Sequence, residues 1–206
     1  MAFRRATGAA ERVGTPAEWL VIGLGNPGAE YDGTRHNVGA EVVSLLASRS
    51  GSRLKAGKER ALSCDVRIDD RLVALAFPQT FMNLSGESVR LLAKRHGVTD
   101  PAAIIVVHDE LDLPVGRVKI KVGGGVAGHN GLKSLLSHLH SPDFVRVRIG
   151  IGRPPGTQQV ADYVLKRPGK ADRVLLDVAV GVAADGVEQI VRVGVERAMN
   201  DTNSVI

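Results

Sequence analysis

The sequence has little cysteine, few aromatic residues and no long apolar run. A single cysteine, Cys64, in 206 residues excludes an internal disulfide framework and fits a reducing compartment. An aromatic content of 3% argues against the base-stacking platforms of proteins that bind single-stranded nucleic acid. No apolar run approaches the ~20 residues of a membrane-spanning helix, and residues 1–18 lack the apolar centre of a secretory signal. We therefore expect a cytoplasmic protein without membrane contacts, in which residues 1–18 form a flexible extension.

The composition and the hydrophobic periodicity predict one α/β domain. An apolar content of 44% with 24% charged residues suits a chain of this length with a sizeable core. Strand-like apolar segments alternate with helical patterns along the chain. The segments that we expect to be strands are 19–24, 64–68, 72–77, 103–108, 117–121 and 144–151, and those that we expect to be helices are 38–49, 87–96, 131–140 and 171–199. We expect a twisted, mixed and mostly parallel sheet flanked by helices over residues 19–200, with residues 201–206 as a tail.

The net charge of +5 and the pI near 9.7 favour a polyanionic partner. Two predicted strands add to this tendency, because apolar and basic residues alternate in residues 117–121 (RVKIK) and 144–151 (FVRVRIGI). Each strand would present one basic face, and in the second strand Arg146 and Arg148 share it. Two such neighbouring faces suit the gripping of phosphate. A solvated sheet face without a ligand is the alternative interpretation.

A glycine-punctuated polar loop, residues 23–39 (GLGNPGAEYDGTRHNVG), follows the first predicted strand. Polar groups just beyond the carboxyl end of a strand are typical of active sites in open α/β sheets. His36 stands at the mouth of the helix that follows, with Asn37 as a candidate N-cap. A helix N-terminus disfavours imidazolium, so we expect His36 to be neutral and able to accept a proton. A simple capping or turn histidine is the alternative.

The same loop contains the spelling of a dinucleotide-binding fingerprint at Gly23, Gly25 and Gly28. That fingerprint requires a helix to begin at its last glycine and an acidic residue about 20 positions further on. Pro27 and the polar residues after it delay the helix, and Ser48 stands where the acidic residue is required. The pattern therefore does not favour a nicotinamide cofactor.

Two further polar segments follow predicted strands. Residues 77–86 (FPQTFMNLSG) contain Asn83, whose amide can donate to a carbonyl oxygen or simply cap a turn. Residues 108–112 (HDELD) place three carboxylates after the clearest buried strand. A metal site is possible there, but no His or Cys spacing completes it. The other possibility is that Asp109, at the strand tip, holds a histidine in its working tautomer. A glycine-rich stretch around His129 and Asn130 predicts a mobile lid or an anion cradle.

Four segments together resemble the bacterial-type peptidyl-tRNA hydrolases in order, spacing and residue identity. They are residues 23–39, 77–86, 108–134 (HDELDLPVGRVKIKVGGGVAGHNGLKS) and 144–154 (FVRVRIGIGRP). The resemblance covers roughly residues 19–200 and is far more specific than the glycine triplet. It implies hydrolysis, without a cofactor or metal, of the ester between a peptide and the 3′ ribose of tRNA. It also implies binding of the acceptor stem, the 3′ end and the 5′-phosphate by a monomer.

The resemblance implies a role for each motif residue. His36 would be the general base that takes a proton from water, and Asp109 would orient it. Asn26 would contact the peptide next to the ester. The remaining residues would bind substrate: Asn83 and Asn130 would hold substrate and water, Tyr31 and Phe81 would line the site, and Lys121 and Arg148 would clamp the 5′-phosphate.

The sequence departs from the family pattern at three positions. Phe77 stands where the family usually has lysine, Ala127 lies in a loop that is usually all glycine, and Pro168 falls near a usual phenylalanine. These departures bear on tRNA affinity and on the mobility of the loop. The alternative function is that of a non-catalytic RNA-binding relative, such as the organellar splicing factors that share this fold. The presence of His36 together with Asp109 counts against it.

Overall fold

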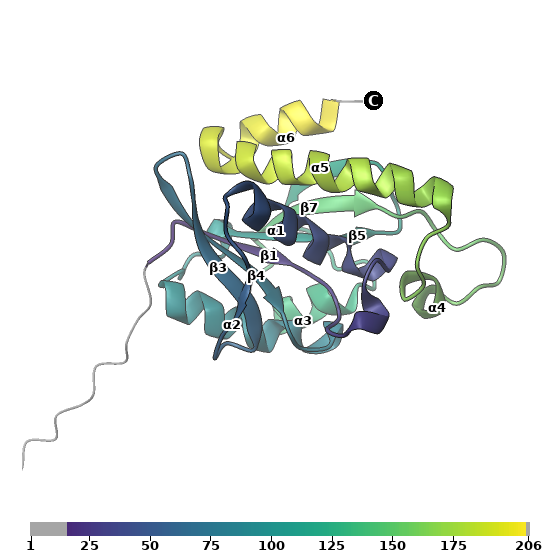
Figure 1. Cartoon of the computed structure of the whole chain (residues 1–206), viewed down its shortest axis with the longest axis horizontal. Helices are drawn as coiled ribbons and strands as arrows, with labels where there is room; N and C mark the ends of the chain where they lie inside the picture. Colours follow the sequence, from purple (N-terminus) through teal and green to yellow (C-terminus); the bar gives the residue numbers. More distant parts are fainter. Residues whose placement is uncertain (1–15, 205–206) are drawn as a thin grey trace, which may run out of the picture.

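A computed structural model describes residues 16–204 as a three-layer α/β/α sandwich (Figure 1). The strands are β1 (Trp19–Gly23), β2 (Lys55–Ala56), β3 (Ala61–Ile68), β4 (Arg71–Pro78), β5 (Ile104–Glu110), β6 (Val118–Val122) and β7 (Val145–Gly150). The helices are α1 (Val38–Arg49), α2 (Ser85–His96), α3 (Asn130–Leu139), α4 (Val160–Val164), α5 (Lys170–Val193) and α6 (Val195–Ser204). Short 3-10 helices are η1 (Ala29–Tyr31), η2 (Arg35–Asn37), η3 (Met82–Leu84) and η4 (Pro101–Ala103). None of the described helices is both long and apolar enough to cross a membrane.

The seven strands form one sheet in the order β2-β3-β4-β1-β5-β7-β6. The central four strands are parallel, because β1 pairs with β4 and β5, and β5 pairs with β7. The pairs β2–β3, β3–β4 and β6–β7 at the two sides are antiparallel. The predicted α/β fold, with a mixed sheet between helices, is confirmed.

Both faces of the central strands are buried, which explains their continuous apolar runs. On one face, Val21 and Val107 pack with residues of α1, α5 and α6. On the other face, Ile22 and Val106 pack with residues of α2 and α3. Successive side chains of a strand therefore enter two different cores, as the two-residue period of a strand requires.

The order of the strands creates a crevice between β1 and β5. From β1 the chain crosses by way of α1 toward β4, whereas after β5 it continues toward β7 on the other side. Ligands of open α/β sheets bind at such a switch point, beyond the carboxyl ends of the strands. The polar loops after β1, β4 and β5 all end at this edge of the sheet.

Two glycines bring α1 directly onto this edge. A Cβ atom on Gly23 would lie 2.2 Å from the carbonyl oxygen of Gly39, and a Cβ atom on Gly39 would lie 2.2 Å from the carbonyl oxygen of Val107. Only glycine permits so close a backbone approach. Hydrogen bonds from Leu24 N to Val107 O (3.0 Å) and from Ala40 N to Leu24 O (3.1 Å) join the same three segments. The start of α1, and therefore His36, is held beside the end of β5.

The C-terminal region differs from the sequence prediction. Residues 171–199 do not form one helix, because the chain turns at Gly194 (φ 90°) between α5 and α6. The expected tail at residues 201–206 is helical as far as Ser204, where the described residues end. Asn203 has a structural role there: its side-chain oxygen accepts from Ile120 N (2.8 Å) and its amide donates to Ile120 O (2.9 Å). The α6 helix thus covers the exposed edge of β6.

The predicted N-terminal extension lies mostly outside the described residues, which begin at residue 16. Its last residues join the domain: Ala17 N donates to His96 O (3.1 Å) and Glu18 N donates to Leu72 O (2.9 Å). Contacts with the domain therefore begin before β1.

Candidate active site

A cavity of about 830 Å³ opens at the switch point and brings together side chains from distant parts of the sequence. Seven of the nine site residues predicted from the sequence line it: Asn26, Tyr31, His36, Phe81, Asn83, Asp109 and Asn130. They come from the loops after β1 and β4, from the end of β5 and from the start of α3. Residues of α4, which the sequence analysis did not connect with the site, form an apolar wall of the same cavity: Val160, Ala161 and Val164.

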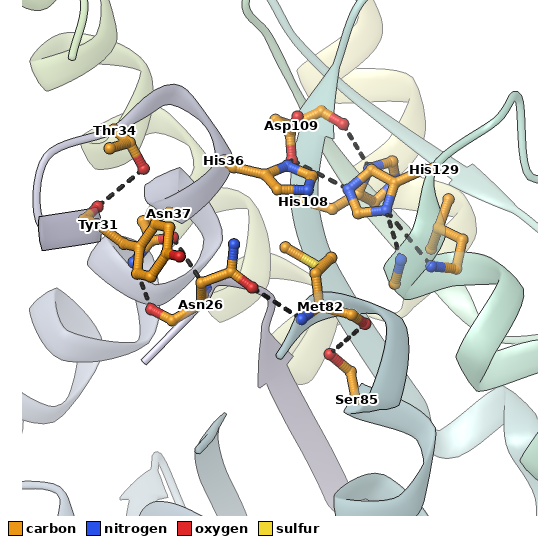
Figure 2. Close-up of polar contacts among 12 residues, drawn as sticks. Asn26, Tyr31, Thr34, His36, Asn37, Met82, Ser85, His108, Asp109 and His129 are labelled. Carbon is orange, nitrogen blue, oxygen red and sulfur yellow. Dashed lines mark hydrogen bonds and ion pairs between the residues drawn. The ribbon is translucent and has the colours of Figure 1, made fainter. Parts of the chain in front are cut away.

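His36 and Asp109 are in direct contact (Figure 2). His36 Nδ1 lies 2.8 Å from Asp109 Oδ1, and both residues are buried. Burial would raise the pKa of Asp109, but the neighbouring His36 and His129 hold that pKa well below its usual value. The carboxylate is therefore ionised and can only accept, so His36 Nδ1 carries the proton. The other ring nitrogen, Nε2, is left with its lone pair, which is the state required of a base.

The expected effect of the helix on His36 is wrong in direction. The position before α1 predicted a disfavoured imidazolium, but the pKa of His36 is raised. Burial alone would lower this pKa, and the charge of Asp109 together with its hydrogen bond outweighs burial. A buried carboxylate in contact acts more strongly than partial charges spread over a helix end.

Asp109 has a second partner that sequence reasoning did not assign. His129 Nε2 lies 3.0 Å from the same Asp109 Oδ1. His129 is the N-cap of α3, where its Nδ1 accepts from Gly131 N (3.1 Å) and Leu132 N (3.4 Å). Because Nδ1 accepts two backbone N–H groups, the ring proton is on Nε2 and is donated to Asp109. Two imidazoles therefore donate to one carboxylate oxygen. A histidine two residues before the predicted helix 131–140 was the sequence signal that could have indicated this cap.

A third histidine, His108, lies behind this pair. Its ring stands edge-on to His129 with centroids 5.0 Å apart, and its Nδ1 donates to the carbonyl oxygen of Asp109 (2.7 Å). The pKa of His108 is lowered to about 3, mainly by burial and to a smaller extent by the nearby His129. His108 is therefore a neutral, fixed support for the strand tip.

The structure also assembles a set of groups with metal-ligand chemistry. One ligand atom each from His36, Asp109 and His129 lies within 4.8 Å of the others. The fixed tautomer of His129 opposes metal binding, because its Nε2 carries a proton. If that proton moved to Nδ1, Nδ1 could no longer accept the two backbone N–H groups of α3, and donor would face donor. The arrangement suits a pair of donors to Asp109 better than a cation.

Asn26 is held by backbone and side-chain contacts. Asn37 does not cap α1 with its side chain; its Oδ1 accepts from Asn26 N and its Nδ2 donates to Asn26 O, both at 2.9 Å. The side-chain oxygen of Asn26 accepts from Met82 N (2.8 Å). Because this oxygen is occupied, the side chain of Asn26 offers the cavity its amide N–H groups. The loop after β1 and the loop after β4 are joined at this residue (Figure 2).

The remaining cavity residues are more exposed and less restrained. Phe81 is 56% exposed, and the side chains of Asn83 and Asn130 make no hydrogen bond among the described residues. Tyr31 ends η1, where its carbonyl oxygen accepts from the Thr34 hydroxyl (2.8 Å). These four side chains form an open rim around the buried pair of His36 and Asp109.

The two predicted phosphate ligands lie outside the cavity. Lys121 is exposed on β6 and Arg148 is half-buried on β7, and the register places both on one face of the sheet. Arg148 Nη1 lies 3.5 Å from Glu110 Oε2. The expected basic face of β7 is correct for Arg148 but not for Arg146, which is 3% exposed. Arg146 holds the glycine-rich loop, donating to Gly124 O and Gly125 O at 2.6 Å each.

The three departures and the glycine fingerprint have clear structural positions. Ala127 adopts φ 44°, a conformation that glycine occupies without strain. Phe77 packs against Gly25, and Pro168 lies between α4 and α5. After Gly28 the chain forms only the short 3-10 helices η1 and η2, and α1 begins at Val38. Only the three-residue η1 begins at the last glycine of the fingerprint, and no α-helix does, so the loop lacks the geometry of a pyrophosphate site.

Comparisons with known proteins show which family this chain belongs to. The family model for peptidyl-tRNA hydrolase matches residues 20–205. The peptidyl-tRNA hydrolase of Nocardia farcinica is 52% identical over 88% of this chain and 94% of its own length. The peptidyl-tRNA hydrolase of Frankia alni is 49% identical over 91% of this chain and 95% of its own length. A crystal structure of peptidyl-tRNA hydrolase from Acinetobacter baumannii superposes with a TM-score of 0.85 at 39% identity, over 96% of this chain and 98% of its own. A complex of peptidyl-tRNA hydrolase with N-propanol gives 0.86 at 40% identity, over 93% and 98%. The chain therefore belongs to the peptidyl-tRNA hydrolase family.

Proposed function

We propose that the protein hydrolyses the ester that joins a peptide to the 3′ ribose of tRNA. The contact between His36 and Asp109 at the wall of the cavity is the observation that carries this proposal. It provides a base whose proton is kept on Nδ1 while Nε2 can accept. An ester is a good electrophile, so one base, a positioned water and amide donors suffice for its hydrolysis.

In the proposed reaction, a water held by His36 Nε2 attacks the ester carbonyl carbon and gives its proton to the imidazole. Asp109 stabilises the resulting imidazolium, as the triad carboxylate does in serine hydrolases. The tetrahedral intermediate breaks the bond between the acyl carbon and the ribose 3′ oxygen. That oxygen takes the proton from His36, which releases a tRNA with a free 3′ hydroxyl and a peptide with a free carboxyl group, and this carboxyl group then loses its proton to solvent.

The asparagines supply donors for the substrate in this proposal. Asn26 presents its amide N–H groups to the cavity, because its side-chain oxygen accepts from Met82 N–H. It therefore suits a carbonyl oxygen, either that of the neighbouring peptide amide or the developing oxyanion. Asn83 and Asn130 bind the substrate and the water, and Tyr31 and Phe81 line the place of the tRNA end. A substrate without the peptide amide leaves the buried Asn26 unpaired, which disfavours free aminoacyl-tRNA.

Lys121 and Arg148 form the proposed clamp for the 5′-phosphate. They share one face of neighbouring strands, and the net charge of +5 attracts a polyanion to that face. Glu110 occupies Arg148 in the structure, so the phosphate would replace this carboxylate as its partner. We propose that the protein acts as a cytoplasmic monomer without a cofactor.

Hydrolysis of N-acetyl-aminoacyl-tRNA in EDTA tests the proposal. We expect ester cleavage by the protein, and we expect His36→Ala to lower kcat by about 10²- to 10⁴-fold, the usual contribution of general base catalysis. His138→Ala is a matched control, because His138 lies on α3 and donates to Ser134 O, away from the cavity. Binding of this tRNA without cleavage would indicate a non-catalytic RNA-binding protein instead.

A further inference from the structure

Arg35, the neighbour of the proposed general base, is buried but takes no part in the cavity lining. Its Nη2 pairs with Asp172 Oδ2 at 3.0 Å, and its Nη1 lies 3.4 Å from Lys166 O and 3.5 Å from Arg167 O. The guanidinium carbon lies 4.2 Å from the centre of the Tyr163 ring. Arg35 therefore faces the connection between α4 and α5, where α4 lies beside the loop that leads into α1 (Figure 1).

A second arginine makes the reciprocal contact. Arg167 Nε donates to Asp32 O (2.8 Å) and its Nη2 donates to Ala29 O (3.4 Å). Each arginine thus holds backbone carbonyls of the opposite segment. Tyr163, on which Arg35 stacks, donates its hydroxyl to Ile151 O (2.6 Å) and ties this assembly to the end of β7.

The local backbone of η2 is too short to orient His36 by itself. A 3-10 helix has 3.0 residues per turn, so neighbouring side chains point about 120° apart. Fixing the direction of Arg35 therefore fixes the direction of His36 on the other side of the chain. The same element, α4, lines the cavity with Val160, Ala161 and Val164. A substrate that contacts α4 therefore contacts the same helix that carries Tyr163, on which Arg35 stacks.

We infer that Arg35 is a positioning residue that aims His36 at Asp109 and couples the α4 wall of the cavity to the proposed base. This inference rests on the proposed function for its kinetic consequences. Arg35 does not touch the substrate. Its effect on the reaction is transmitted through the backbone of η2 and through the contact between His36 and Asp109.

Three variants test the inference: Arg35→Ala, Arg35→Lys and the control Arg173→Ala. Arg173 is also a partly buried arginine of this region, but its fork binds Glu41 (3.1 and 2.9 Å) and joins α5 to α1 without contacting η2. We expect Arg35→Ala to lower kcat by at least about 30-fold while KM changes less than about threefold, because alignment for attack is lost and substrate contacts are kept. Arg35→Lys keeps the positive charge but loses the planar guanidinium group. Its kcat should therefore lie between that of the wild type and that of Arg35→Ala.

Added guanidinium chloride at low millimolar concentration, below denaturing levels, should partly restore kcat of Arg35→Ala and have no effect on Arg173→Ala. The melting temperature of each variant is measured in parallel. If Arg35→Ala and Arg173→Ala lose kcat equally at equal loss of melting temperature, Arg35 is only a structural residue and the inference is wrong.

An NMR titration of the His36 ring, without substrate, gives a readout that does not depend on activity. The charged and titratable groups that face this ring are Asp109 and His129. In Arg35→Ala the ring should lose its contact with Asp109, and its titration should move to lower pH. In Arg173→Ala the His36 ring should titrate at the same pH as in the wild type. An unchanged titration in Arg35→Ala would overturn the inference. Absence of hydrolysis by the wild type would instead overturn the proposed function and leave this test intact.

Discussion

A neutral His36 and an ionised Asp109 are required together, and each group sets the pKa of the other. The pKa of His36 is raised because Asp109 outweighs burial, and the pKa of Asp109 is lowered mainly by His36 and His129. The proposed base acts as neutral imidazole, so activity should rise with pH through a value above the ordinary pKa of 6.5. His129 shares the same carboxylate oxygen, which limits how much of its charge is available to His36.

The variant Asp109→Asn should move the acidic limb of the pH profile to lower pH. Without the carboxylate, burial is the remaining large influence, and burial lowers the pKa of a histidine. The maximal rate should fall by roughly 10²- to 10⁴-fold, because asparagine can also stabilise the wrong tautomer of His36. The measurement is kcat/KM against pH for both proteins. A limb that stays at the wild-type pH would mean that Asp109 does not control the protonation of the base.

The sequence predicted well the strands and helices that have a strong hydrophobic periodicity. It did not predict which side chains form hydrogen bonds with one another. The strands around β1 and β5 follow from apolar runs buried on both faces, and the position of His36 after β1 follows from the rule for strand ends. The pairing of His129 with Asp109 joins residues 20 positions apart, with β6 between them, and no local pattern indicates it. Asn37 stood at the predicted N-cap position, but tertiary contacts with Asn26 took its side chain.

The break between α5 and α6 is another feature that depends on a tertiary contact and that the local sequence pattern does not predict. The apolar period of the sequence continues past Gly194 and predicts one helix over residues 171–199. The turn is favoured by a tertiary contact: α6 folds back so that Asn203 can pair with the edge of β6. An edge strand with free backbone groups is a site for unwanted pairing, and this asparagine satisfies them.

Replacement of Asn203 by alanine should expose that edge. The change removes two hydrogen bonds to the backbone of Ile120 and leaves those groups without their partner, which costs about 1–3 kcal/mol of unfolding free energy. Urea unfolding measures the loss, and hydrogen exchange should become faster at the Ile120 amide. Asn200→Ala is the control, because Asn200 is exposed on the same helix. Equal stability of the two variants would show that the edge does not need this cover.

For the molecule as a whole, the residues proposed for catalysis and those proposed for anchoring the tRNA occupy separate places. The cavity holds the proposed ester chemistry at the ends of β1, β4 and β5, whereas Lys121 and Arg148 lie outside it toward the β6 edge. The resemblance of four motifs indicated both places, but only the fold shows that they are distinct. Affinity for tRNA and the rate of the chemical step should therefore respond to different substitutions.

The salt dependence of tRNA binding tests this separation. Each cation that neutralises a phosphate releases a counterion, so removing one such contact should reduce the slope of log Kd against log salt by about one. We expect this reduction for Lys121→Ala and for Arg148→Ala, measured in the His36→Ala background so that cleavage does not intervene. Lys55→Ala is the control, because β2 and β6 are opposite edges of the sheet. With a tRNA that lacks the 5′-phosphate, Lys121→Ala should bind as tightly as its parent, since the phosphate that Lys121 contacts is then absent. If Lys121→Ala weakened binding equally with and without the 5′-phosphate, this lysine would contact another part of the tRNA, and the two basic strands would not form a clamp for the 5′ end.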